Sequence, residues 1–233
     1  MQRAATGDEG WCGWQDRHGA ASPRDARLRR RWDREAGAYD RGMAVAERRF
    51  FPDVRPRACA LATGETPEVA IGTGLNLAHY PAPVLAGRLT GVEWSPGMLA
   101  VARRRAAERS IDVDLRLGDA QRLDLPDDSY DTVVCTFSLC AIPDHRAALA
   151  EMVRVLRPGG LLVLADHVAS TSWPFRALQA MADAVSVPLA GEHFRRRPLR
   201  WVLDAGLAVE RHERTRAGVI EWFAARTPGP RAR

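Results

Sequence analysis

The chain has 233 residues, of which 46% are hydrophobic and 27% are charged, with a formal net charge of +5 and a pI of about 9.5. These values are ordinary for a soluble globular protein; the length allows one sizeable domain plus a tail and is short for two. No lysine occurs, so the positive charge comes from arginine. We interpret the arginine-rich stretches 24–34 and 195–200 as a solvated basic surface, with an anionic substrate, a membrane surface or nucleic acid as the alternative.

The four cysteines are Cys12, Cys59, Cys135 and Cys140, and they show no paired Cys-x-x-Cys spacing. This pattern argues against a structural zinc site and provides no disulfide framework, so no metal is expected. No stretch approaches the roughly 20 apolar residues that a membrane-spanning helix needs. The N-terminus lacks the basic and then apolar regions of a secretory signal. We therefore expect a cytoplasmic protein without an integral membrane segment.

The N-terminal part of the chain divides into a tail and a helical region. Residues 1–25 mix small, charged and aromatic residues with no sustained period, which predicts a poorly ordered tail. The pattern over residues 28–62 is helical, with interruptions expected near Gly42, at Pro52 and at Pro56. We expect residues 26–233 to form the folded domain, with this helical region as an N-terminal cover.

A regular alternation of strands and helices begins near residue 68. The strand patterns are short apolar runs, and the helix patterns between them are about 10 to 15 residues long. This alternation predicts right-handed crossovers and a doubly wound, Rossmann-like α/β sheet. A lid is expected near residues 170–198. The expected strands are 68–71, 88–92, 113–117, 130–136 and 161–165, the helices 96–109, 144–156, 172–185 and 198–205, and the final hairpin 207–214 with 219–226.

The first expected strand runs into Gly72-Thr73-Gly74. In a doubly wound sheet, ligands bind beyond the carboxyl ends of the strands, beside the first strand. Glycine permits a positive φ and lets a ligand approach the backbone, but Gly-x-Gly alone is also compatible with a turn that binds nothing. Leu77 stands where a dinucleotide fingerprint would have its third glycine, so binding of a pyrophosphate is not specified.

Two acidic residues give this loop a more specific meaning. Glu93 ends the second expected strand, 19 residues after Gly74, where its carboxylate can accept hydrogen bonds from both hydroxyls of a ribose. Asp119 follows Gly118 at the end of the third expected strand, where an acid can accept from an adenine amine; a simple turn former is the alternative interpretation. Together these residues predict a site for an adenosyl ligand.

Five successive segments of the chain resemble the motifs of the class I S-adenosylmethionine-dependent methyltransferases. The resemblance extends over about Trp32 to the C-terminus. It implies a seven-stranded sheet, mostly parallel, that ends in an antiparallel hairpin, and it implies S-adenosyl-L-methionine as the cofactor. The segments are 68–74, Glu93, 118–120, 131–135 and 155–160.

By this resemblance, Gly72 and Gly74 lie against the amino-acid end of the cofactor, Glu93 holds the ribose and Asp119 holds the adenine amine. Met98 flanks the adenine ring, with a core methionine as the alternative.

The loop and the leading helix add two candidates. The family's usual first glycine is Ala70 here, which tightens the loop. The stretch 32–40 resembles the leading helix of quinone and small-molecule methyltransferases, whose Tyr-Asp pair closes over the cofactor. This makes Tyr39 a candidate contact, with helix packing as the alternative. The candidate cofactor contacts are Tyr39, Ala70, Gly72, Thr73, Gly74, Asn76, Glu93, Trp94, Met98, Asp119, Ala120, Cys135 and Thr136.

The segments 76–81, 135–143 and 165–168 look most like those of thiol S-methyltransferases, and bacterial phosphatidylethanolamine and quinone methyltransferases are close in the same motifs. We therefore expect methylation of a small-molecule acceptor that presents a sulfur or oxygen nucleophile. The alternative is N-methylation of a phospholipid headgroup of the phosphatidylethanolamine type.

Methyl transfer is an in-line displacement, so the protein mainly aligns the nucleophile with the methyl group in a dry pocket. Cys135 and Cys140 are therefore interpreted as small residues of a crowded loop. A base is needed where the nucleophile arrives protonated. The candidates are His167, just past the fifth expected strand, and His193 in the expected lid, each with a structural role as the alternative.

Two other functions compete with methyl transfer. A nicotinamide-dependent oxidoreductase would use a similar sheet, but Leu77 and the Gly118-Asp119 pair argue against it. A non-catalytic cofactor-binding or nucleic-acid-binding protein would use the arginines, but no aromatic stacking platform or recognisable reading module is present. The expected partner is a small-molecule acceptor and not nucleic acid; peripheral membrane contact is left open.

Overall fold

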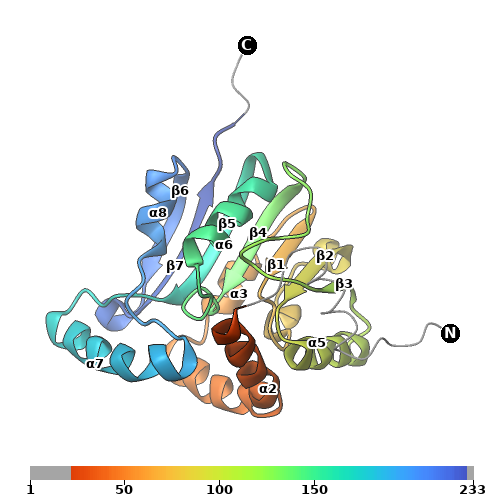
Figure 1. Cartoon of the computed structure of the whole chain (residues 1–233). Coiled ribbons are helices and arrows are strands. Elements are labelled where there is room, and N and C mark those ends of the chain that lie inside the picture. The colour runs from red at the N-terminus through yellow and green to blue at the C-terminus, as the bar shows by residue number, and fades with distance from the viewer. Residues whose placement is uncertain (1–21, 230–233) are drawn as a thin grey trace.

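The structure is a computed structural model that describes residues 22–229, and its sheet has seven strands in the order β3-β2-β1-β4-β5-β7-β6 (Figure 1). Neighbouring strands are parallel from β3 through β5, whereas β7 is antiparallel to both β5 and β6. The predicted Rossmann-like sheet with a C-terminal antiparallel hairpin is confirmed. The strands are β1 (Thr66–Val69), β2 (Ala86–Glu93), β3 (Asp112–Leu117), β4 (Tyr130–Thr136), β5 (Leu156–His167), β6 (Ala208–Arg214) and β7 (Ile220–Arg226).

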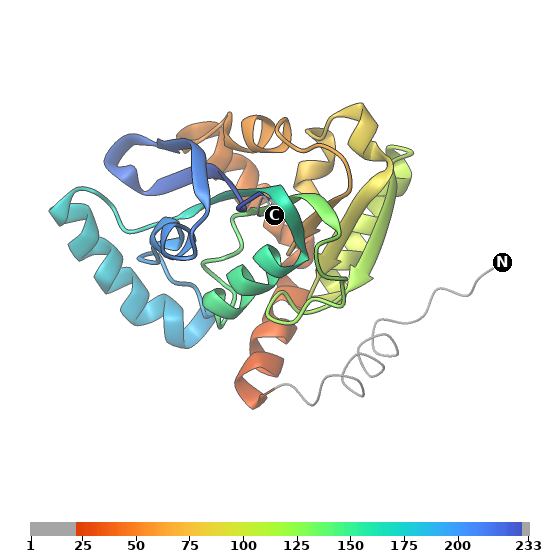
Figure 2. The same cartoon turned by 90° about the horizontal axis from the view of Figure 1, so that it is seen from above.

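Helices pack on both faces of the sheet (Figure 2). Side chains of successive strand residues point to opposite faces, so Leu162 of β5 joins one core cluster and Val163 the other. Because both faces are covered, residues 161–165 of β5 are all apolar and buried. One face carries α6 (His145–Val155) and α8 (Pro198–Asp204), and the other α3 (Val54–Cys59), α4 (Ala82–Leu85) and α5 (Pro96–Glu108); two short 3-10 helices are η1 (Leu75–Ala78) and η2 (Arg216–Gly218).

Helix α2 (Pro23–Phe50) lies across the carboxyl edge of the sheet (Figure 1). The Ser22 hydroxyl caps its first turn by accepting a hydrogen bond from the Asp25 amide. The helix continues through Gly42, so the expected interruption there is wrong; one glycine costs a helix only about 1 kcal/mol. The break falls at Pro52, as expected. The interruption expected at Pro56 is wrong, because Pro56 lies in the first turn of α3, where proline is tolerated. Residues 1–21 of the expected tail lie outside the described residues.

Helix α7 (Trp173–Ala190) opens the segment expected to act as a lid, and it lies along the same edge of the sheet as α2 (Figure 1). The Gln179 side chain donates to the carbonyls of Val168 and Phe194 at 2.9 and 3.0 Å, which ties the helix to the end of β5. Nowhere between residues 22 and 229 is a helix both long enough and apolar enough to cross a membrane. The apolar face of α7 nevertheless exposes Trp173, Phe175, Leu178, Met181, Val185 and Leu189.

Candidate active site

A pocket of about 660 Å³, counted with its open mouth, lies between α2 and the loops that follow β1, β2, β3 and β4. Eight of the residues predicted to contact a cofactor line it: Tyr39, Ala70, Gly72, Glu93, Trp94, Met98, Asp119 and Ala120. The other residues that line it, which were not among the predicted cofactor contacts, are Trp32, Val92, Gly118, Phe137, Ser138, Ala141, Ile142 and Pro143.

The loop after β1 has a left-handed backbone at three alternate residues, with φ of 56° at Ala70, 61° at Gly72 and 76° at Gly74. A Cβ added at Gly72 would meet no atom within 4 Å, so this residue leaves open space in the pocket. A Cβ at Gly74 would lie 2.9 Å from Leu77 and 3.3 Å from Ala102. The missing side chain at Gly72 therefore leaves room for a ligand, whereas the missing side chain at Gly74 leaves room for η1 and α5 to pack closely against the loop.

Glu93 joins two loops at the pocket floor. Its Oε2 accepts from the Gly72 amide at 2.9 Å, and its Oε1 accepts from the Ser95 amide at 2.8 Å. Burial raises the pKa of Glu93, and these amide hydrogen bonds oppose the rise. Each carboxylate oxygen has a second lone pair, so Glu93 can still accept from a pair of ligand hydroxyls.

The wall beyond β3 carries the predicted adenine contact. Asp119 Oδ1 accepts from the Gln121 amide and the Gln121 side chain, both at 2.9 Å, which orients the carboxylate. Met98 is buried at the start of α5 and lines the same pocket, as does Trp94. An acid beside apolar side chains suits a flat heterocycle with an exocyclic amine.

Helix α2 covers the pocket and is fixed by two aspartates seven residues apart. Asp33 accepts from the Ser95 hydroxyl at 2.6 Å and from the Gly97 amide at 2.9 Å. Asp40 accepts from the Thr73 hydroxyl at 2.6 Å and also pairs with Arg105. The i, i+7 spacing of these aspartates places them on one helix face. This spacing was the feature of the sequence from which both contacts could have been predicted.

Five predicted contacts do not line the pocket: Thr73, Gly74, Asn76, Cys135 and Thr136. Asn76 and Thr136 instead belong to a buried network beneath the loop. Arg55 Nη1 donates to Asn76 Oδ1 at 2.9 Å and to Thr136 Oγ1 at 2.8 Å. Asn76 Nδ2 donates to Glu68, which also accepts from Tyr80 at 2.8 Å. Burial raises the pKa of Glu68 to about 7.

Phe137 links the pocket to the candidate base His167. It lies directly after β4 with φ of 52°, lines the pocket, and stacks on Phe51 with ring centroids 4.8 Å apart. The His167 ring centroid lies 5.8 Å from that of Phe137 and 5.9 Å from that of Phe194. His167 is thus half-buried, one aromatic ring away from the pocket.

His193, the other candidate base, lies in a second cleft with Arg24, His145 and Arg196. Its amide donates to the Cys140 carbonyl at 2.9 Å. Burial and the nearby Arg196 lower the pKa of the His193 imidazole. The two clefts share Pro143, but the structure brings only His167 close to Phe137.

Comparison with known proteins finds sequence similarity to methyltransferases. Residues 67–164 match the family model described as "Methyltransferase domain". The chain is 38% identical over 118 residues to a phosphatidylethanolamine N-methyltransferase of Cereibacter sphaeroides, and 33% identical over 162 residues to a demethylmenaquinone methyltransferase of Deinococcus radiodurans. These matches cover 50% and 60% of this chain, and 57% and 66% of the two relatives.

Solved structures show the same fold. A methyltransferase in complex with the Haloferax volcanii Trm112 activator aligns with a TM-score of 0.65 at 20% identity, over 84% of this chain and 97% of that one. An S-adenosylmethionine-dependent methyltransferase of Thermotoga maritima aligns with a TM-score of 0.62 at 23% identity, over 84% and 98%.

The strand order and the pocket at the carboxyl edge define a Rossmann-like, class I methyltransferase fold. Within it, residues 67–164 are similar to the methyltransferase domain family.

Proposed function

We propose that this protein transfers a methyl group from S-adenosyl-L-methionine to a small-molecule acceptor with a sulfur or oxygen nucleophile. The observation that carries the proposal is the convergence of Gly72, Glu93 and Asp119, from the carboxyl ends of three strands, on one pocket. The named relatives and the matched methyltransferase domain support the same reaction class.

The residues of the pocket fit an adenosyl ligand. Gly72 provides backbone free of side-chain obstruction, and Glu93 retains acceptor capacity for the two ribose hydroxyls. Asp119 accepts from the adenine amine, with Met98 against the ring face. When bound, S-adenosylmethionine supplies a methyl group on a positively charged sulfur. Tyr39 and Trp32 of α2 exclude water above it.

The acceptor is proposed to lie beside Phe137, between the pocket and His167. Phe51, Phe137 and Phe194 make this region apolar, which suits a small apolar metabolite. A thiol or hydroxyl must lose its proton to become a good nucleophile, and His167 is the candidate base that adjoins Phe137.

The proposal is tested by calorimetric titration of S-adenosylmethionine and of NADH, followed by an acceptor screen with labelled donor. Thiols, phenols, amines, quinones and phospholipids form the panel. Glu93→Ala should weaken binding of the donor at least about 100-fold, because hydrogen bonds to a charged group contribute about 1.5–3 kcal/mol each. The matched control is Glu210→Ala, because the carboxylate of Glu210 is exposed on β6, away from the pocket. Binding of NADH but not of S-adenosylmethionine would refute the assignment.

A phospholipid headgroup amine is the second candidate acceptor. The apolar face of α7 favours it, because six large apolar side chains are exposed along one helix of the lid region. The next segment carries Arg195, Arg197 and Arg200, and such a combination suits peripheral contact with an anionic lipid surface. The phosphatidylethanolamine arm of the screen separates this acceptor from thiols.

A further inference from the structure

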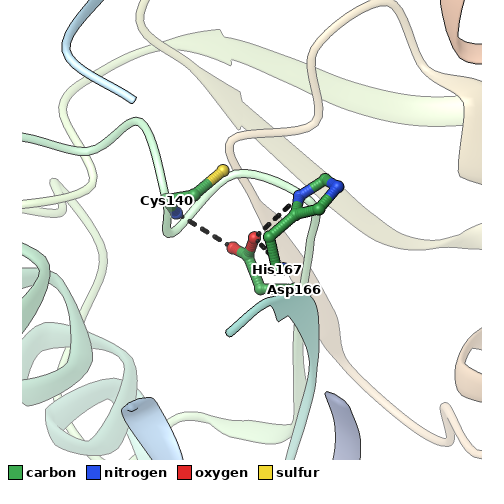
Figure 3. A group of neighbouring side chains, drawn as sticks. All are labelled: Cys140, Asp166 and His167. Carbon is green, nitrogen blue, oxygen red and sulfur yellow. Dashed lines mark hydrogen bonds and ion pairs between the residues drawn. The ribbon is translucent and has the colours of Figure 1, made fainter. Parts of the chain in front are cut away.

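Cys140, Asp166 and His167 form a compact group of metal-ligating side chains (Figure 3). Cys140 comes from the loop after β4, whereas Asp166 and His167 end β5. One donor atom from each residue lies within 4.8 Å of the other two, and His167 Nδ1 is 3.6 Å from Asp166 Oδ1. The sequence separation of 26 residues between Cys140 and Asp166 explains why no ligand spacing was visible in the sequence.

The backbone holds the Asp166 carboxylate in place. Its Oδ2 accepts from the Cys140 amide at 3.0 Å and its Oδ1 from the His167 amide at 2.6 Å. Each oxygen keeps a lone pair for a further partner. Asp166 and Cys140 are both buried, at 4% and 8% exposure. The carboxylate is therefore oriented before any ligand binds.

His167 Nδ1 is buried and makes no hydrogen bond to any residue within the described part of the chain. Its 3.6 Å separation from Asp166 is too long for a hydrogen bond. The rings of Phe51, Phe137 and Phe194 surround the imidazole and hold its orientation. The buried His167 ring nitrogen lies near a carboxylate and a thiol but is bonded to neither. This arrangement points to a further partner that all three side chains would bind.

We propose that Cys140, Asp166 and His167 bind a zinc ion. Thiolate, imidazole and carboxylate are all zinc ligands, and tetrahedral coordination separates donor atoms by roughly 3.3–3.7 Å. The observed separations approach this range, so side-chain adjustments of about 1 Å suffice. Two ionised ligands would balance the divalent charge, which a buried site requires. Burial beside Asp166 raises the pKa of the Cys140 thiol, so zinc binding must displace its proton to solvent.

Three protein ligands leave a fourth position, which is the arrangement of catalytic zinc sites. Phe137, Ser138 and Ala141, from the same loop as Cys140, line the candidate active site. A thiol acceptor in the fourth position would form a sulfur–zinc bond, lose its S–H proton to solvent and present a thiolate to the methyl group. With zinc bound, His167 therefore acts as a ligand, and the base role proposed above applies to the metal-free site. The role of zinc in activating the thiol rests on the proposed function, whereas the zinc binding itself does not.

The test uses the full chain stripped of metal by a chelator and titrated with Co²⁺ and Zn²⁺. We expect one ion per chain by elemental analysis, together with the near-ultraviolet charge-transfer absorption of a cobalt thiolate. Cys140→Ser should abolish that absorption, and His167→Gln should weaken binding more than about 100-fold, since loss of an outer-shell partner alone costs roughly 10–100-fold. Cys59→Ser and His212→Gln are controls, because Cys59 is also a buried free cysteine and neither residue belongs to the cluster.

Absence of a stoichiometric ion, or equal effects of the ligand and control variants, would overturn the zinc site. In that case the Cys140 thiol simply donates to Asp166. Circular dichroism confirms that each variant is folded, and Cys140→Ala provides a second ligand-free variant. Calorimetry with S-adenosylmethionine on the same preparations keeps the two proposals apart: retained donor binding without zinc refutes only the metal site, and zinc binding without donor binding refutes only the proposed function.

Discussion

Glu93 Oε2 accepts a hydrogen bond from the Gly72 amide at 2.9 Å, while Oε1 of the same carboxylate accepts one from the Ser95 amide. A single side chain thus sets the distance between the loop after β1 and the start of α5. The same carboxylate is the proposed acceptor for the ribose hydroxyls, so loop geometry and ligand binding depend on one residue.

Glu93→Gln should affect both properties. An amide has one carbonyl oxygen, so only one of the two backbone amides keeps its acceptor and the other faces an NH₂ group. We expect a loss of about 1–3 kcal/mol in the free energy of unfolding, measured by urea titration, and at least about 10-fold weaker binding of S-adenosylmethionine. Unchanged affinity in a folded variant would contradict the ribose assignment.

Gly72→Ala should impair ligand binding more than its effect on stability explains. Gly72 has φ of 61° and open space at the Cβ position; Gly159 has φ of 80° and equally open surroundings outside the pocket. Both alanine variants should lose roughly 1–2 kcal/mol of stability from left-handed strain. Only Gly72→Ala should also weaken donor binding in calorimetry. Equal affinities for the two variants would show that Gly72 does not face the ligand.

Stability should fall with rising pH because of Glu68. Burial raises its folded-state pKa to about 7, above the ordinary value of 4.5, so the native state holds this proton more tightly than the unfolded chain. The contribution is fully present below about pH 4.5 and declines up to about pH 7, by roughly 3 kcal/mol. Glu68→Gln should remove this decline in urea titrations across that range. Glu65→Gln is the control and should preserve it.

His167→Gln should reduce kcat for the preferred acceptor by roughly 10²–10⁴-fold, the usual size of a base effect, while leaving the KM for S-adenosylmethionine nearly unchanged. His193→Gln should change kcat much less, since His193 lies in the second cleft. Steady-state kinetics with both variants check this expectation. A larger loss in His193→Gln would transfer the role to the second cleft.

Binding to lipid vesicles should depend on the apolar face of α7. Leu178→Glu combined with Met181→Glu replaces two side chains that are 60% and 69% exposed. We expect reduced co-sedimentation with vesicles of phosphatidylethanolamine and phosphatidylglycerol. Leu203→Glu on α8, where Leu203 is 53% exposed, should have little effect. If the wild-type protein does not co-sediment with these vesicles, the phospholipid alternative loses its structural support.

Much of the fold was predictable because the sheet is built from local patterns. Alternating apolar runs and amphipathic helices identified all the strands, with shifts of a few residues at their ends. Strand β5 begins at Leu156, earlier than the apolar run alone indicated, because Leu156 pairs with Tyr130 before the register shift. The expectation at Gly42 was wrong, because tertiary contacts stabilise α2 before the glycine, through Asp33 and Asp40, and after it, through the ion pair of Glu47 with Arg55.

By itself, the sequence determined the residues that end successive parallel strands: Gly72, Glu93 and Asp119 meet in one pocket because the carboxyl ends of parallel strands share an edge. The contacts between residues that are far apart in the sequence were decided only by the tertiary structure. It moved Asn76 and Thr136 into a buried network with Arg55, and it separated His193 from His167. It also brought Cys140 to Asp166. Such contacts depend on how loops and covering helices pack, and short-range periodicity carries no record of that packing.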